Sequence, residues 1–361
     1  MEPYWIIAAP LVAAIASPLV VRLAGVRKGG VVLATAPFLI AIWLLGEANA
    51  GEAVSEWSRP WLGSLGIEFA LRVGGFERFF LFLVSFIGGL VLIYGGGYFA
   101  GDKQAARFYV IVLLFMASML GVIAADDLML LFVFWELTSL TSFLLIGYKH
   151  TDVETRKAAL QALLVTGAGG LALLGGLILL TQITGETRLS GLAAHSGQLA
   201  ASPLYVPALC LLLAGAFTKS AQVPFHFWLP GAMLAPTPVS AYLHSATMVK
   251  AGVILLAKLS PALAGSPLWG WLVIPVGAAT MLLGAAMAVV QTDLKRLLAY
   301  STISVLGTLV MLLGFGDAFS FKTAMFLALA HGFYKGALFM VAGTVDHTTG
   351  PRDVRSLSGL R

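Results

Sequence analysis

Apolar residues in this chain form long stretches that are separated by short polar connections. A helix needs about 20 apolar residues to cross the hydrocarbon core of a bilayer, so the pattern predicts about eleven membrane-spanning helices. The expected ranges are 4–24, 30–48, 76–100, 107–124, 128–148, 159–184, 205–222, 240–260, 268–290, 297–315 and 320–343. The predicted fold class is therefore all-α, a polytopic membrane helical bundle.

The basic residues between these segments predict the orientation of the chain. Lys and Arg gather on the inner side of membrane proteins. With the N-terminus outside, most of the 22 basic residues fall in inward segments, namely Arg22, Arg27, Lys28, Lys103, Arg107, Lys149, Arg156, Lys157, Lys295, Arg296, Arg352, Arg355 and Arg361. The longest polar connection, residues 49–75, is then an external interfacial segment.

One stretch, residues 221–231, is not expected to form a continuous helix. It contains Pro224, His226 and Pro230, and Pro236 and Pro238 follow shortly after. Proline removes a helical hydrogen bond and clashes with the preceding turn. Since the freed backbone groups must meet protein or water inside a membrane, we predict a broken helix that lines a cavity.

Composition excludes several classes of function. Hydrophobic residues make up 59% of the chain and charged residues only 11%, far from the composition of a soluble domain. The net charge of +5 is scattered between apolar spans rather than clustered with aromatic residues, so no nucleic-acid partner is expected. The single cysteine, Cys210, gives no support for a disulfide or a zinc site, and we expect no metal and no cofactor.

Ionisable residues inside the apolar segments are the main functional candidates, because isolated charge in a bilayer is expensive and usually marks an ion or proton path. Glu136 lies about eight residues into its span, roughly 12 Å along the helix. Lys219 is its most plausible partner, since charges about 4 Å apart attract by roughly 4 kcal/mol at an effective dielectric constant of 20. The alternative is a structural carboxylate that a neighbouring helix satisfies.

Two further pairs extend this set. His244 and Lys250 are six residues apart on one predicted helix, hence on different faces but separated by only about 9 Å of rise. His331 and Lys335 are four apart, so they share one helix face and can point at one aqueous cavity. A packed, neutral histidine is the alternative for His244, whereas a buried ammonium needs water or a counter-charge.

Two motifs carry a resemblance to a known family. Residues 134–148, FWELTSLTSFLLIGY, closely resemble a helix of the A subunit of Mrp-type cation/proton antiporters. Residues 217–252 resemble the signature of the proton-conducting membrane subunits that Mrp antiporters share with respiratory complex I. They include the Lys-Ser-Ala-Gln-Val-Pro-Phe-His run at 219–226 and the Leu-His-Ser-Ala-Thr-Met-Val-Lys run at 243–250.

The resemblance implies an antiporter-like fold with two inverted five-helix repeats, each containing a broken helix with a central lysine. Glu136 and Lys219 match the paired carboxylate and lysine of the first repeat, Lys250 matches its connecting lysine, and His331 and Lys335 match polar residues that feed the second repeat. We expect helices 1–3 in residues 1–106, the first repeat in residues 107–265 and an incomplete second repeat in residues 266–361. The second broken helix is expected beyond Arg361, so the chain is expected to be a piece of a longer subunit or one part of a split subunit.

These observations lead to two hypotheses of function. The first is a membrane subunit of a multi-subunit monovalent cation (Na⁺)/proton antiporter, in a bacterial inner membrane with the other Mrp subunits as partners, and not an enzyme. The second is a proton-pumping subunit of a redox complex, either respiratory complex I or a membrane-bound hydrogenase. A purely structural scaffold explains the spans but not the buried charges.

Overall fold

The structure is a computed structural model, and it describes residues 2–49, 51, 54–350 and 352–357. Two residues that the sequence analysis covered, Arg361 near the end of the chain and Glu52 in the external connection, therefore lie outside the described residues. The chain divides into two compact units, Met1–Tyr148 and Lys149–Arg361, which are described separately. The predicted three-part division by repeats groups the helices differently, and it stays a prediction.

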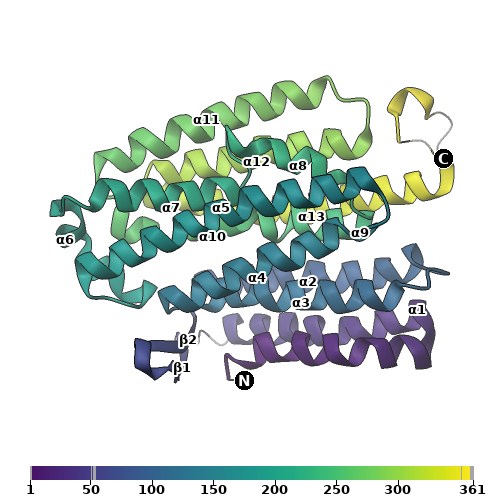
Figure 1. The fold of residues 1–361 in the computed structure, drawn as a ribbon, viewed down its shortest axis with the longest axis horizontal. Coiled ribbons are helices and arrows are strands. Elements are labelled where there is room, and N and C mark those ends of the chain that lie inside the picture. Colours follow the sequence, from purple (N-terminus) through teal and green to yellow (C-terminus); the bar gives the residue numbers. More distant parts are fainter. Residues whose placement is uncertain (1, 50, 52–53, 351, 358–361) are drawn as a thin grey trace. The chain divides into compact units, whose positions relative to one another are not determined.

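Unit 1 begins with α1, Trp5–Asn49, which consists of two helices joined at Gly25. Gly25 has a positive φ of 76°, which glycine adopts readily. The chain folds back there, since a Cβ added at Gly29 would lie 3.4 Å from the Cα of Val21, and Figure 1 shows the two halves of α1 side by side. The two segments predicted at 4–24 and 30–48 are thus a helical hairpin.

A β-hairpin follows in the segment for which the sequence predicted only an external connection. Strand β1, Ser55–Leu62, pairs antiparallel with β2, Ile67–Val73, and a 3-10 turn, Gly63–Leu65, joins them. Trp57 and Trp61 both contact the ring of Phe69 edge-on. These strands are a small addition to an otherwise helical protein.

Three helices complete unit 1: α2 Gly75–Tyr98, α3 Ala105–Ala124 and α4 Leu128–Ile146. Helix α4 begins after Asp127, whose side chain accepts hydrogen bonds from the backbone N–H groups of Met129 and Leu130, both at 2.9 Å. This N-cap satisfies two of the backbone donors that the first turn of a helix leaves free. Glu136 lies in the middle of α4.

Unit 2 contains the longer helices and both interruptions of the bundle. Its α-helices are α5 Val153–Thr184, α6 Ser196–Ala201, α7 Tyr205–Lys219, α8 Trp228–Gly231, α9 Thr237–Ser245, α10 Ala251–Leu263, α11 Pro267–Val289, α12 Leu294–Gly314 and α13 Ala318–Thr349. Short 3-10 helices lie at Leu189–His195, Phe225–Phe227, Ala232–Leu234, Met248–Lys250 and Val354–Ser356.

Glycines set the closest helix contacts of unit 2. A Cβ at Gly169 of α5 would overlap Thr218 of α7, and a Cβ at Gly176 would overlap Leu212, so these two helices pack at short distance. The same holds where Gly277 of α11 meets the backbone of α12.

Among the described residues, nine helical segments are long and apolar enough to span a membrane. One of them is α1, which is two helices, and α7 is a shorter apolar helix of 15 residues. Every one of the eleven predicted segments therefore corresponds to a helix or a helix pair. The prediction of a polytopic membrane helical bundle with a broken helix is confirmed.

Candidate functional site

Helix α7 ends directly at Lys219 through a Schellman motif. The N–H of Gln222 donates to the Phe217 carbonyl at 2.9 Å, and the N–H of Ala221 donates to the Thr218 carbonyl at 3.4 Å. Ala221 occupies the C′ position, where glycine is usual, and has a φ of 49°. The motif leaves the fully buried Lys219 in the last turn, where the helix dipole favours a cation.

The segment after Lys219 is the break that the sequence predicted. Pro224, His226 and Pro230 lie in short turns between α7 and α9, with Pro224 exposed and the other two partly buried. Side chains satisfy backbone groups that have no helical partner here. The Val223 N–H donates to Thr280 Oγ1 at 3.0 Å, and the Thr218 carbonyl accepts from Trp228 Nε1 at 2.9 Å. The roles of the two prolines and of His226 stay predictions.

The prediction of a continuous helix over 240–260 is wrong. Helix α9 ends at Ser245, and α10 begins only at Ala251. Between them Thr247 has non-helical φ and ψ of −125° and −105°, and its Oγ1 donates to the Tyr242 carbonyl at 2.7 Å. The helical rise expected between His244 and Lys250 therefore does not apply.

Lys250 turns back across this second break. Its Nζ donates a hydrogen bond to the Ser245 carbonyl at the end of α9, and its side chain is fully buried. An ammonium is a strong donor for the carbonyls that the last turn of a helix leaves without a helical partner. Lys250 therefore links the two halves of the interrupted helix.

Helix α7 packs directly on this second break. Ser220 Oγ donates to the carbonyl of Val249, the residue before Lys250, at 2.7 Å. A Cβ added at Gly252 would overlap both the Ala216 carbonyl oxygen and the Ser220 hydroxyl. The backbone that carries Lys219 and the backbone that carries Lys250 are thus in contact.

His331 lies near two buried lysines. The Ser245 carbonyl, which accepts from Lys250, also faces the His331 ring, although neither ring nitrogen makes a hydrogen bond of good geometry. Lys250 and Lys335 both lie within electrostatic range of that ring. The structure therefore brings together three of the predicted residues, Lys250, His331 and Lys335, which we call the central cluster.

Lys335 has its own polar partners on α12. Its Nζ donates to Ser301 Oγ and lies 3.5 Å from the Leu298 carbonyl, and Ser301 Oγ in turn donates to that carbonyl at 3.2 Å. The ammonium also lies 5.7 Å from the centre of the Tyr334 ring, within range of a cation–π contact. Hydroxyl, carbonyl and aromatic groups thus surround this buried cation.

The sequence analysis missed Lys295, which it assigned to a polar connection. Lys295 is 2% exposed, and its Nζ donates to the Ala235 carbonyl at 2.6 Å. It lies within electrostatic range of His244 and of Asp293, Asp346 and Arg352. The sequence feature that could have identified Lys295 is Asp293, because an N-cap at this position places Lys295 inside the first turn of α12.

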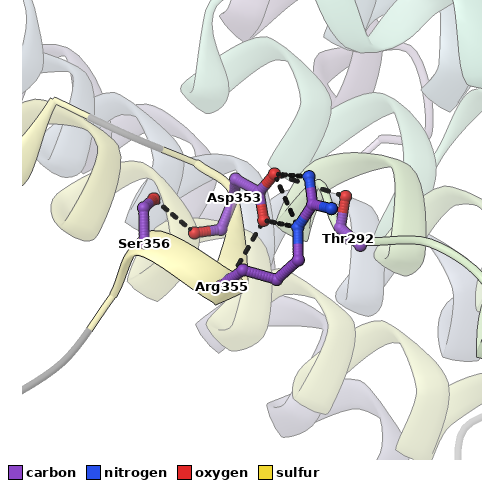
Figure 2. Close-up of polar contacts among 4 residues, drawn as sticks. All are labelled: Thr292, Asp353, Arg355 and Ser356. Carbon is purple, nitrogen blue, oxygen red and sulfur yellow. Dashed lines mark hydrogen bonds and ion pairs between the residues drawn. The ribbon is translucent and has the colours of Figure 1, made fainter.

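The segment after α13 is attached close to Lys295. The Leu294 N–H donates to the Arg352 carbonyl at 3.0 Å, and the Val354 N–H donates to the Thr292 carbonyl at 2.9 Å. Figure 2 shows the Arg355 guanidinium against the Asp353 carboxylate, with Thr292 alongside. Hydrogen bonds from Arg355 lower the pKa of Asp353 to about 2.

Glu136 belongs to the other unit. It is partly buried on α4, with Thr138 and Ser139 following it, and both hydroxyls bond back to the carbonyl of Trp135. Lys219 belongs to unit 2. The pairing of Glu136 with Lys219 therefore stays a prediction.

Comparison with known proteins agrees with this architecture. Residues 125–361 match a family model described as NADH:quinone oxidoreductase/Mrp antiporter, TM, and residues 57–109 match one described as NADH-Ubiquinone oxidoreductase (complex I), chain 5 N-terminus. The chain is 44% identical to the A subunit of a Na(+)/H(+) antiporter of Alkalihalophilus pseudofirmus, over 99% of this chain and 46% of that protein. It is 49% identical to the A/B subunit of a probable K(+)/H(+) antiporter of Rhizobium meliloti, over 90% of this chain and 32% of that protein.

Solved structures show the same fold. One is the Mrp complex from Dietzia sp. DQ12-45-1b, with a TM-score of 0.91 and 41% identity over 99% of this chain and 39% of that chain. Another is an archaeal membrane-bound sulfane sulfur reductase, with a TM-score of 0.86 and 23% identity over 98% of this chain and 58% of that chain, which shows the fold alone. The chain spans less than half the length of the curated relatives named above.

Fold and site together define a multi-pass membrane protein whose helices are interrupted beside buried lysines. The chain belongs to the NADH:quinone oxidoreductase/Mrp antiporter transmembrane family.

Proposed function

We propose that this chain is the membrane subunit of a multi-subunit antiporter that exchanges Na⁺, or another monovalent cation, for protons. The observation that carries the proposal is the central cluster, where Lys250, His331 and Lys335 come together in the buried interior of unit 2. Buried ionisable groups inside membrane helices are costly, and they usually mark an ion or proton path. The names of the relatives, which describe subunits of Na(+)/H(+) and K(+)/H(+) antiporters, support the same function.

In the proposed mechanism Glu136 and Lys219 form a charge-coupled switch. A proton that neutralises Glu136 removes its attraction for Lys219, which then favours another partner or passes on its own proton. The end of α7 lies against Val249, so the effect reaches Lys250 and then His331 and Lys335. His244 lies one residue from the carbonyl that Lys250 contacts and is the sixth member of this relay.

The proposed setting is a bacterial inner membrane with the N-terminus outside and the other Mrp subunits as partners. The positive-inside distribution of Lys and Arg supports the orientation. The similarity to a chain of a solved Mrp complex supports the hetero-oligomer.

Antiport in inverted membrane vesicles that hold the whole assembly tests the proposal. A pH dye reports proton release when sodium, potassium or lithium is added in turn, which also identifies the cation. We expect Glu136→Ala and Lys219→Ala each to abolish antiport without loss of membrane insertion. Lys157→Ala, which removes an exposed lysine paired with Glu154 at 2.9 Å, is the matched control and should transport normally. Normal antiport in either relay variant would refute the assigned roles.

A redox-driven proton pump is the second candidate. The matching family model includes NADH:quinone oxidoreductase subunits, and the fold is shared with an archaeal respiratory complex. The same set of buried residues could move protons whether a cation gradient or a redox reaction supplies the energy, so these residues do not distinguish the two functions. Co-purification of the chain with quinone- or iron–sulfur-bearing subunits would favour the pump over the antiporter.

A further inference from the structure

The tip of the α1 hairpin, residues 21–29, carries three exposed basic side chains. They are Arg22, Arg27 and Lys28, and none of these side chains makes a hydrogen bond or an ion pair with another described residue. Residues 4–46 contain no Asp or Glu. The α1 tip, as we call residues 21–29, therefore carries positive charge that no acid of the same hairpin offsets.

Helices α2 and α3 hold the α1 tip in place. Tyr109 of α3 donates from its hydroxyl to the Val26 carbonyl at 3.2 Å, and a Cβ at Gly96 of α2 would lie 3.0 Å from the Arg27 carbonyl oxygen. The connection between α2 and α3 therefore lies at the same end of unit 1 as the α1 tip. We call the basic residues of this end the basic end of unit 1: Arg22, Arg27, Lys28, Lys103 and Arg107.

One acid lies at this end, and protein groups already contact its carboxylate. Asp102 accepts from the Tyr148 hydroxyl at 3.1 Å and from the Gln104 N–H at 2.7 Å. It is the only Asp or Glu in residues 78–125. The basic end of unit 1 therefore keeps a surplus of positive charge.

A second Arg-Lys pair in the chain shows the same residue types with their charge satisfied. Arg156 and Lys157 lie in the first turns of α5, on the side that the positive-inside rule also places in the cytoplasm. Lys157 pairs with Glu154 at 2.9 Å, and Arg156 donates to the His150 carbonyl at 2.7 Å. Since the pair at positions 27 and 28 has no such partners among the described residues, its charge is available to a ligand.

Exposed apolar side chains of α1 adjoin the α1 tip. Ile15, Leu19 and Leu23 follow one stripe of the first half of α1 and are 82%, 60% and 78% exposed. Val31 and Val32, which come directly after the tip, are also exposed. A phospholipid matches both parts of this surface, with an anionic phosphate and apolar chains, whereas an acidic protein surface would match the charge alone.

We propose that the basic end of unit 1 binds the phosphate of an anionic phospholipid, whose acyl chains lie along the exposed stripe of α1. Arg and Lys donate strong, charge-assisted hydrogen bonds to phosphate oxygens. The predicted orientation places this end in the cytoplasmic leaflet, whose surface is negatively charged and where basic pockets beside membrane helices bind anionic headgroups. This lipid site goes beyond the proposed function and does not depend on antiport.

Photoactivatable lipids test the site in nanodiscs of phosphatidylcholine that hold the whole assembly. One probe is phosphatidylglycerol with a photoactivatable group in an acyl chain, and the other is phosphatidylcholine with the same chain and no net charge. Mass spectrometry locates the cross-linked residues. We expect the phosphatidylglycerol probe to label residues 12–32 at least about tenfold more than the phosphatidylcholine probe, because several basic side chains each attract the anionic headgroup.

Exposed residues allow matched variants without loss of folding. Arg27→Gln with Lys28→Gln should remove the preference for the anionic probe. Arg156→Gln with Lys157→Gln, which removes the same charges from unit 2, should keep it. The exchange Arg27→Lys with Lys28→Arg retains both charges and should also keep it.

Two results would overturn the proposal. Equal labelling of α1 by the two probes would mean that ordinary, unselected lipid surrounds the hairpin. Labelling of a partner subunit in place of α1 would mean that another protein covers the basic end of unit 1. Neither result depends on antiport or on the sidedness of the chain, so failure of the lipid site and failure of the proposed function are distinguishable.

Discussion

Ala221, two residues after Lys219, is held in a conformation that alanine rarely adopts. Its φ of 49° lies in the left-handed region, which costs a non-glycine residue about 1–2 kcal/mol. We expect Ala221→Gly to raise the free energy of unfolding by up to about 1 kcal/mol, measured by thermal unfolding of the purified assembly. The control is Ala208→Gly in the interior of α7, which should lower it by about 1 kcal/mol. A less stable Ala221→Gly variant would show that the backbone is not strained there.

Asp127 predicts a pH dependence in unit 1. Burial raises the pKa of this N-cap carboxyl, with a contribution from the charge of Glu68, while hydrogen bonds from Leu130 and Met129 oppose the rise. Because the folded state binds the proton more tightly, the stability from this group is fully present below the ordinary pKa of about 3.9 and is lost as the pH rises through the raised value.

Asparagine at this position caps a helix equally well and does not ionise. We therefore expect Asp127→Asn to raise the melting temperature at pH 7, with a gain that shrinks as the pH approaches 4. Melting curves of the assembly across this range check the sign. A variant that is less stable than the unchanged protein at every pH would contradict it.

Individual buried cations were predictable where they interrupt an apolar run. Lys219, Lys250 and Lys335 lie inside apolar stretches that carry no other Lys, Arg, Asp or Glu, so the sequence marks them by the cost of burying charge. Lys295 lies close to Asp293 and next to Arg296, and such a cluster of charged residues is typical of a solvated connection between helices. Its burial depends on the Ala235 carbonyl, 60 residues away, and on α13, and no local pattern reports such contacts.

At the scale of elements, Gly252 controls how closely α10 approaches α7. A Cβ at this position would overlap the Ala216 carbonyl and the Ser220 hydroxyl, which belong to the backbone around Lys219. We expect Gly252→Ala to force the two helices apart, with a loss of about 1–3 kcal/mol in stability and a large loss of antiport. Thermal unfolding and vesicle antiport measure the two effects separately.

Gly167 on α5 provides the matched comparison. A Cβ added there meets no atom within 4 Å. Gly167→Ala should therefore gain helix propensity, by up to about 1 kcal/mol, and keep its antiport. Equal behaviour of the two alanine variants would mean that the α7–α10 contact does not depend on the missing side chain.

Only one of the two interruptions in unit 2 was predictable from sequence. Pro224 and Pro230 indicate the first, because proline cannot continue a helix. The second, between Ser245 and Ala251, contains neither proline nor glycine. Side chains stabilise it: Lys250 Nζ donates to the Ser245 carbonyl at the end of α9, and Thr247 Oγ1 donates to the Tyr242 carbonyl, which it shares with the Ala246 N–H.

At the scale of the whole molecule, membrane thickness made the spans predictable. A helix that crosses hydrocarbon must satisfy its own backbone and reach a fixed length, so apolar runs alone locate the eleven segments. The β-hairpin at residues 55–73 escaped prediction, because its Trp57 and Trp61 also suit an interfacial loop. The predicted pairing of Glu136 with Lys219 stays a prediction, because it depends on how the two units come together and no sequence pattern within either unit specifies that.

Orientation is the prediction that belongs to this scale. Helix α2 separates the β-hairpin from residues 99–104, so exposed Arg59 and exposed Lys103 must lie on opposite sides of the membrane. In a Cys210→Ser background, we expect an impermeant thiol reagent to label Arg59→Cys but not Lys103→Cys in intact cells, because the positive-inside rule places Lys103 and Arg107 in the cytoplasm. Permeabilised cells, in which both should be labelled, control for reactivity. The reverse pattern in intact cells would invert the predicted orientation.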